Sequence, residues 1–155
     1  RGWDFWDRMD DIGLAGAWVH AIGKVGCFMA GCCHGVQCMT SDLGVIFRDP
    51  KSHAEPLGKA LYPVQLWDSG IIFLSIILMY ALLKRGKRFS GQVFLIYSVV
   101  YGVGRFFTES YRGDVERGFL FNGLLSHSQF IAILVVLASV GLYVILRRRG
   151  LKQSL

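Results

Sequence analysis

The sequence predicts an all-α protein: a polytopic transmembrane helical bundle of about four spans, with an irregular outer loop between the first two. The 155-residue chain is 53% hydrophobic with a mean hydropathy of +0.43, which is too apolar for an ordinary soluble domain. Four apolar segments are each roughly 20 residues long, the length that crosses a hydrocarbon core. Short basic runs flank these segments. We therefore expect residues 1–155 to form a single integral-membrane domain.

The apolar segments place the spans at about residues 12–33, 63–83, 91–108 and 125–146. The first segment is rich in glycine and alanine, and small residues at four-residue spacing let helix backbones approach closely. We therefore expect the first helix to be central in the bundle. The last segment is uniformly aliphatic over residues 131–137 and is expected to face lipid.

The basic runs predict the orientation of the chain in the membrane. Residues 84–88 and the tail from Arg147 to Lys152 are rich in lysine and arginine, which favours the cytoplasmic side. With four spans, residues 1–11 are then also cytoplasmic, and the loops 34–62 and 110–124 lie on the outer side. Residues 1–11 mix aromatic and acidic side chains, which is typical of an interfacial segment. Within the first outer loop, residues 43–47 are expected to form a short strand.

Two cations lie inside apolar segments, where an ionisable residue is costly and usually marks a site. Lys24 lies near the middle of the first span, and Arg105 lies in the third, with Tyr101 and Glu109 on the same helical face. We expect Lys24 and Arg105 to converge, with an anion or a carboxylate between them and Glu109 within reach. An ion pair that ties helices together is the structural alternative. In a membrane, a lipid phosphate is the commonest anion that two cations could bind.

The cysteines suggest a second kind of site. Cys27, Cys32 and Cys33 lie at the end of the first span, followed by His34 and Cys38. Such a cluster can hold zinc or an iron–sulfur centre, but the spacing matches no familiar metal-binding motif. Small apolar packing residues are the simpler interpretation, so we expect no metal ligand and no cofactor. A nucleic-acid partner is not expected, because no recognition helix or stacking platform accompanies the basic residues.

Four stretches of the sequence correspond to short motifs. Residues 23–35, GKVGCFMAGCCHG, resemble a glycine-rich signature that begins G-R-x-G-N/C-F. Residues 101–112, YGVGRFFTESYR, keep every fixed letter of Y-G-x-x-R-F-x-x-E-x-x-R. Residues 62–68, YPVQLWD, correspond to H-P-x-Q-L-Y-E, and residues 125–129, LSHSQ, to L-S-x-x-Q. The four motifs are distributed over most of the chain, in the order found in the prolipoprotein diacylglyceryl transferases of bacterial inner membranes, a family that the chain resembles.

The resemblance implies transfer of the diacylglyceryl group of phosphatidylglycerol to the lipobox cysteine thiol of a preprolipoprotein, in the bacterial inner membrane. With the charge pattern, it gives the candidate catalytic residues Arg105, Lys24, Glu109 and Tyr101. The candidate substrate-binding residues are Gly23, Gly26, Cys27, Gly35 and Gln65. The partners implied are phosphatidylglycerol, the signal peptide of the preprolipoprotein and the bilayer.

The sequence departs from the family pattern at a few positions. Lys24 stands where the family usually has arginine, Tyr62 replaces a histidine, and Trp67 and Asp68 replace Tyr-Glu. The chain opens without Met, so we expect its numbering to begin inside a longer reading frame, at the last four of seven family spans. Two alternative functions remain. One is a catalytically impaired phospholipid-binding relative, and the other is a membrane thiol or metal protein built on the cysteine cluster.

Overall fold

The computed structural model describes residues 4–39, 43–113, 118–120 and 124–153. Its helices are α1 (Phe5–Ala30), α2 (Val64–Arg85), α3 (Gln92–Glu109) and α4 (His127–Gln153). Two small antiparallel sheets pair β1 (Val45–Ile46) with β2 (Ala60–Leu61), and β3 (Phe119–Leu120) with β4 (Leu125–Ser126). The predicted fold class, a helical membrane bundle, is confirmed.

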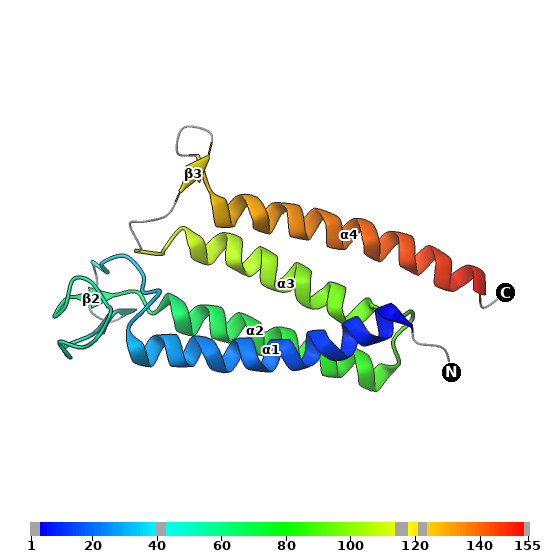
Figure 1. Cartoon of the computed structure of the whole chain (residues 1–155), viewed down its shortest axis with the longest axis horizontal. Coiled ribbons are helices and arrows are strands. Elements are labelled where there is room, and N and C mark those ends of the chain that lie inside the picture. The colour runs from blue at the N-terminus through cyan, green and yellow to red at the C-terminus, as the bar shows by residue number, and fades with distance from the viewer. Residues whose placement is uncertain (1–3, 40–42, 114–117, 121–123, 154–155) are drawn as a thin grey trace.

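The four helices run side by side, and the sheets lie at one end of the bundle (Figure 1). α1 packs against α2, while α3 lies between α2 and α4. Both chain ends and the connection between α2 and α3 lie at the opposite end from β2 and β3 (Figure 1). The two loops that were expected on the outer side therefore lie at one end of the bundle, and the two termini and the basic runs lie at the other end.

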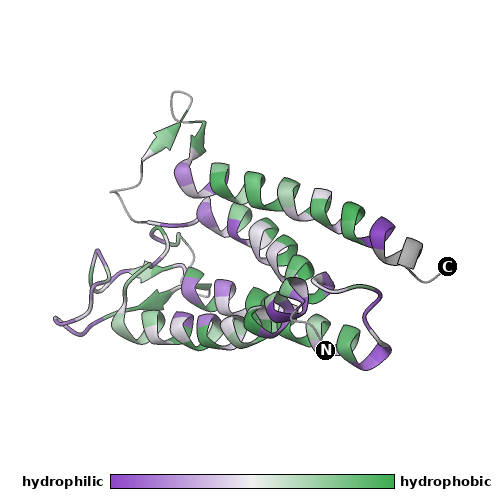
Figure 2. Cartoon of the chain, turned by 45° about the vertical axis from the view of Figure 1, so that its right-hand side comes forward, coloured by the Kyte–Doolittle hydropathy of each residue, from purple (hydrophilic) through white to green (hydrophobic). Residues whose placement is uncertain are grey.

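Three helices, α1, α2 and α4, are long and apolar enough to cross a membrane. The third expected span forms α3, which has only 18 residues and carries Arg105 and Glu109. Its polar groups are sheltered between α2 and α4. Figure 2 shows hydrophobic residues along the middle of α4 with hydrophilic residues toward its two ends, the pattern of a lipid-facing helix.

α1 differs from the expectation at both ends. It begins at Phe5, so most of the segment that we expected at the membrane interface, residues 1–11, forms the first turns of this helix. Trp3 lies outside the described residues. It ends at Ala30, because Gly31 adopts a left-handed conformation with φ +75°. A side chain at Gly31 would also collide with Ser52 Oγ, so only glycine fits this helix end.

α1 is not the central helix. Its buried residues follow one stripe, Asp10, Gly13, Ala17 and Ala21, which packs on α2 and α3. At the glycines in positions 16, 23 and 26, no neighbouring atom lies within 4 Å of the point that a β-carbon would occupy. The small residues of α1 therefore do not all mark helix contacts. The more central helix is α3, which packs against α1, α2 and α4.

The buried carboxylate of Asp10 fastens α1 to the start of α3. It accepts hydrogen bonds from the backbone N–H groups of Gly91 and Phe94, both at 2.9 Å, and from Lys87 Nζ at 3.0 Å. Those N–H groups have no partner within the helix, and a negative charge is favourable at a helix N-terminus. This contact fixes the axial position of α1 relative to α3, and hence of Lys24 relative to Arg105.

At the opposite end, the chain after α1 is joined to the chain after α3 by backbone hydrogen bonds. Val36 N donates to Tyr111 O at 2.8 Å, and Gly113 N donates to His34 O at 3.0 Å. The expected strand over residues 43–47 is present as β1, which pairs with β2 just before α2. Residues 114–117 and 121–123 of the second outer loop lie outside the described residues.

Candidate functional site

Lys24 and Arg105 converge as predicted, and a carboxylate lies between them. Lys24 Nζ of α1 donates to Oδ2 of Asp68 on α2 at 2.7 Å, and Arg105 Nη1 of α3 lies 3.6 Å from the same oxygen. Arg105 Nη2 lies 2.6 Å from Oε2 of Glu109, one turn along α3. Three helices thus each contribute to one four-residue charge cluster, which we call the ionic cluster.

The ionic cluster is shielded from solvent. The side chains of Asp68 and Glu109 are 2% and 1% exposed, and those of Lys24 and Arg105 are 12% and 13% exposed. Buried charges are tolerated only when they are paired and hydrogen-bonded, and here two cations balance two carboxylates. The ionic cluster therefore carries no net charge. Removal of any one of its members leaves a buried charge of the opposite sign uncompensated.

Each carboxylate of the ionic cluster accepts a hydrogen bond from a hydroxyl group. Thr108 Oγ1 donates to Asp68 Oδ1 at 2.6 Å, and Ser126 Oγ donates to Glu109 Oε1 at 3.1 Å. Ser126 is in turn held by Gln129, whose backbone N–H donates to Ser126 Oγ at 3.1 Å at the start of α4. This chain of contacts links the ionic cluster to α4, the fourth helix of the bundle.

Arg105 borders a cavity of about 230 Å³ between α3 and α4. Tyr101 and Ser128 are the other polar residues of its lining, together with Gly102, Ile131, Ala132 and Val135. Arg105 Nη1 is buried and makes no hydrogen bond within the described part of the chain, because Asp68 Oδ2 is too distant for one. A buried guanidinium nitrogen without an acceptor, beside a cavity, suits an anionic ligand.

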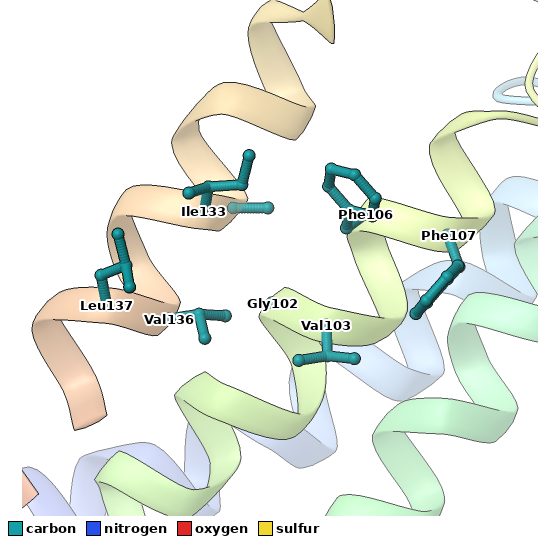
Figure 3. Close-up of a pocket in the computed structure, with 8 residues that line it drawn as sticks. Gly102, Val103, Phe106, Phe107, Ile133, Val136 and Leu137 are labelled. Atoms are coloured by element: carbon teal, nitrogen blue, oxygen red, sulfur yellow. The ribbon is translucent and has the colours of Figure 1, made fainter.

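A second, wholly apolar cavity of about 290 Å³ lies beside the first (Figure 3). Its lining includes Val103, Phe106 and Phe107 from α3 and Ile133, Val136 and Leu137 from α4. Gly102 and Ala132 line both cavities. A β-carbon at Gly102 would come within 2.8 Å of Val136 Cγ2, so glycine lets α3 and α4 approach closely where the two cavities meet.

Tyr101, the fourth candidate catalytic residue, belongs to an aromatic group beside the ionic cluster. Its ring stacks on Tyr97 with centroids 6.1 Å apart and meets the His20 ring edge-to-face at 4.7 Å. His20 Nδ1 lies 2.9 Å from the Tyr97 hydroxyl. Tyr101 lines the same cavity as Arg105, one turn earlier on α3. The structure therefore places all four candidate catalytic residues in one region.

The candidate substrate-binding residues are dispersed. Gly23 and Gly26 are exposed on α1. Gly35 lies in the outer loop, where its N–H donates to Tyr62 O at 2.9 Å and a side chain would collide with Tyr62. Gln65 is fully buried, and its Nε2 donates to Cys32 O at 2.8 Å. The structure thus gives Gly35 and Gln65 clear roles in holding the loop at the end of α1.

Sequence reasoning missed several members of the site. Asp68, Thr108, Ser126 and Gln129 were not among the candidates, although Asp68 ends the 62–68 stretch where the family has a glutamate. That acidic position was the available signal, because two cations inside apolar segments need an anion or a carboxylate between them. Ser126 and Gln129 are fixed letters of the L-S-x-x-Q motif, which was the signal for them. Thr108 gave no signal, since hydroxyl residues are common in membrane helices and only the fold brings this one onto Asp68.

The comparisons with known proteins agree with one another. A family model for prolipoprotein diacylglyceryl transferase matches residues 1–145. Phosphatidylglycerol–prolipoprotein diacylglyceryl transferase 2 of Clostridium perfringens is 35% identical over 98% of this chain and 57% of its own length. The corresponding transferase of Clostridium tetani is 33% identical over 99% of this chain and 58% of its length.

A transferase of Dehalococcoides mccartyi is 40% identical over a shorter region, 55% of this chain and 32% of its own length. No solved structure matches the chain. The chain spans about half the length of the curated relatives it matches most fully. The match over residues 1–145, with two relatives aligned along nearly the whole chain, shows that this protein belongs to the prolipoprotein diacylglyceryl transferase family.

Proposed function

We propose that this chain transfers the diacylglyceryl group of phosphatidylglycerol to the lipobox cysteine thiol of a preprolipoprotein. The observation that carries the proposal is Arg105: a buried guanidinium with an unused donor, bordering one cavity with polar lining and lying next to a wholly apolar one. A phospholipid has the matching parts, since its phosphate is anionic and its acyl chains are apolar. The names of the relatives support the same substrates.

The reaction needs stabilisation of a phosphate leaving group. The thiolate sulfur of the lipobox cysteine attacks the glyceryl carbon that bears the phosphate ester, an S–C bond forms, and the C–O bond breaks. The bonding electron pair leaves on glycerol phosphate, whose phosphate gains negative charge. A guanidinium held in a site with little water is well suited to stabilise that charge, because its donors need no reorganisation during the reaction.

The other members of the ionic cluster hold Arg105 in place. Glu109 pairs with Nη2, and Asp68 lies near Nη1, so the guanidinium plane is held from two sides. Lys24 neutralises Asp68 through the 2.7 Å contact, which leaves Arg105 free to interact with an added anion. The attacking sulfur belongs to the substrate, so this mechanism gives no nucleophilic role to the cysteines of the chain.

The placement in the cell follows from the same proposal. Phosphatidylglycerol and preprolipoproteins meet at the bacterial inner membrane, and the basic residues 84–88 and 147–149 favour a cytoplasmic location for that end of the bundle. Arg105 lies near the other end of α3, toward the outer loops. The signal peptide of the substrate would then approach the bundle laterally within the bilayer.

The test uses membranes that contain the chain, phosphatidylglycerol labelled in its diacylglyceryl part, and a lipobox peptide. The expected result is label on the peptide cysteine and an equal amount of released glycerol phosphate. A lipobox peptide with serine in place of the cysteine is the control and should remain unlabelled. Transfer that is equally fast with the serine peptide would contradict the proposed thiol chemistry.

A phospholipid-binding protein without transfer activity is the second candidate. The observation that favours it is the pairing of both cations with carboxylates, which is also what a purely structural cluster would show. The two candidates separate on one preparation. Binding of phosphatidylglycerol without release of glycerol phosphate supports the second candidate, and release coupled to peptide labelling supports the first.

A further inference from the structure

Three cysteines gather at the end of α1, outside the ionic cluster. The Sγ atoms of Cys27, Cys32 and Cys33 all lie within 4.8 Å of one another. All three cysteines are free and partly buried. Cys27 is on the last turn of α1, and the other two follow the left-handed Gly31 that ends the helix. From this arrangement we propose that the three thiols bind one thiophilic d¹⁰ cation, Zn²⁺ or Cu⁺.

The backbone conformation explains how two consecutive cysteines, Cys32 and Cys33, both bring their Sγ atoms close to that of Cys27. Side chains of adjacent residues in a helix diverge, so both cannot face Cys27 if the helix continues. Here Gly31 has φ +75° and Cys33 has φ +57°, and this pair of left-handed residues turns the chain back over the last helical turn. A non-glycine residue in that conformation is uncommon. Cys32 Sγ consequently lies 3.7 Å from the backbone oxygen of Cys27.

The sulfur positions suit a metal–thiolate centre. With a Zn–S bond of about 2.3 Å, tetrahedral geometry separates the sulfurs by about 3.8 Å. The distances between the sulfurs are at most 4.8 Å, so they would need to decrease by no more than about 1 Å, which side-chain rotation can supply. Soft thiolate ligands select Cu⁺ and Zn²⁺ over hard cations such as Mg²⁺ and Ca²⁺. The three cysteines are only partly buried, so an ion is not barred from their sulfurs by surrounding side chains on every side.

The neighbouring His34 does not belong to this site. Its Nε2 accepts a hydrogen bond from Glu55 N at 3.3 Å, so Nδ1 carries the proton and donates to Gly35 O at 3.0 Å. Both ring nitrogens are therefore occupied by the backbone of the outer loop. Cys38, although close in sequence, is buried and lies outside the group of three sulfurs. The proposed site is thus a three-sulfur site, trigonal for Cu⁺ or completed by an outside ligand for Zn²⁺.

The sequence alone favoured packing residues for these cysteines, because their spacing resembles no familiar zinc motif. The missing information was the left-handed turn at positions 31–33, which no spacing rule encodes. The structure adds that the three sulfurs lie within 4.8 Å of one another, close enough for one ion to contact all three. This proximity carries the proposal.

The test measures metal binding alone, so its result does not depend on whether the chain transfers diacylglyceryl groups. The whole chain is purified in detergent under anaerobic, reducing conditions and titrated separately with Zn²⁺ and with Cu⁺ against competing chelators. We expect one ion per chain in at least one titration. Each of Cys27→Ser, Cys32→Ser and Cys33→Ser should weaken binding at least about 100-fold. Cys38→Ser is the matched control and should bind like the unchanged chain.

A second readout needs no variant. The unchanged chain is treated with an alkylating reagent with and without the ion, and the modified cysteines are identified by mass spectrometry. Protection of Cys27, Cys32 and Cys33, with no change at Cys38, supports the site. Failure of both ions to bind at one equivalent, or equal loss of binding in Cys38→Ser and the three cluster variants, would overturn the proposal. Uptake of Zn²⁺ rather than Cu⁺ identifies the four-coordinate form.

Discussion

Lys24 and Arg105 both lie close to one carboxylate oxygen, the Oδ2 atom of Asp68: Lys24 Nζ donates to it at 2.7 Å, and Arg105 Nη1 lies 3.6 Å away, within ion-pair distance only. The two cations are nevertheless not equivalent. Only Arg105 borders the cavity between α3 and α4, and only its Nη1 nitrogen lacks a hydrogen bond within the described residues. Lys24 is hydrogen-bonded to Asp68, and neither of these two residues lines the cavity. Under the proposed function, we therefore expect Arg105 to contact the substrate and Lys24 to act as a positioning residue.

Replacement of Arg105 tests the first of these roles. Arg105→Ala should reduce transfer to a lipobox peptide by at least about 100-fold, since one preorganised donor to a developing oxyanion contributes that much. Arg105→Lys should restore only part of the rate, because lysine lacks the planar fork of donors. Arg147→Ala, an exposed arginine near the end of α4, is the control and should have no effect. Comparable rates in Arg105→Ala and Arg147→Ala would refute the assignment.

Lys24→Arg should keep most of the activity or raise it. The variant restores the residue that the family resemblance places at this position, and it keeps the positive charge beside Asp68. Lys24→Met should instead lower the rate constant at saturating lipid. Arg105 would then be the only cation of the cluster left to pair with Asp68, and its guanidinium would be less available to the substrate. Measurement of the rate against phosphatidylglycerol concentration separates the two variants. A collapse of activity in Lys24→Arg would show that this site has diverged from the family arrangement.

The sequence predicted the charged pair but not the whole cluster. Arg105 and Lys24 were recognisable because a cation inside an apolar run is costly, and that rule needs no tertiary structure. Asp68 sits in the first turns of α2, close enough to the loop to resemble an ordinary helix-start residue. Its partnership with Lys24 depends on the axial position of α1 against α2, which the pattern of apolar residues does not encode. Thr108 and Ser126 depend on tertiary packing in the same way.

The existence of the four helices was predictable from the sequence, whereas the residues at which they begin and end were less predictable. The end of α1 differs by three residues from the expected limit at residue 33, because Gly31 adopts a left-handed conformation. The central position expected for α1 was wrong for a related reason. Glycines at positions 16, 23 and 26 resemble packing residues in the sequence, yet they lie on the exposed side of the helix. Composition alone cannot distinguish small residues that pack against a neighbouring helix from small residues that lie on the exposed side.

Asp68→Asn should destabilise the bundle as well as impair transfer. The change removes the carboxylate that Lys24 contacts, and loss of one partner from a buried ion pair costs about 3–5 kcal/mol. Thermal unfolding in detergent should therefore show a lower midpoint for Asp68→Asn than for the unchanged chain. The double variant Lys24→Met with Asp68→Asn should recover part of this loss, because no lone buried charge remains there. An additive effect of the two changes would contradict the pairing.

Gly102→Leu should separate α3 from α4. A β-carbon at Gly102 already comes within 2.8 Å of Val136, so a larger side chain must push the helices apart or fill the two cavities that meet there. Overpacking of this kind costs about 1–3 kcal/mol. The matched control is Gly141→Leu on α4, where no atom lies within 4 Å of the β-carbon position. Binding of labelled phosphatidylglycerol should fall in the first variant and remain unchanged in the second.

Lys87 should affect stability without affecting chemistry, because it lies at the opposite end of the bundle from the outer loops. It contacts Asp7 at 2.5 Å and Asp10 at 3.0 Å. Partial burial alone would lower the pKa of Lys87, but the hydrogen bonds with Asp7 and Asp10 outweigh burial and raise this pKa above its ordinary value of 10.5. Lys87→Met should lower the free energy of unfolding by about 1 kcal/mol at neutral pH.

The sign of the pH dependence follows from that raised pKa. A group with a raised pKa in the folded state stabilises the fold fully below its unfolded pKa, and the stabilisation is lost as pH rises through the folded pKa. The stability difference between the unchanged chain and Lys87→Met should therefore be constant from about pH 6 to pH 9 and should narrow above about pH 10.5. Lys84→Met, an exposed lysine at the end of α2, is the control. A difference that already disappears near neutral pH would show that Asp7 and Asp10 do not hold Lys87 as described.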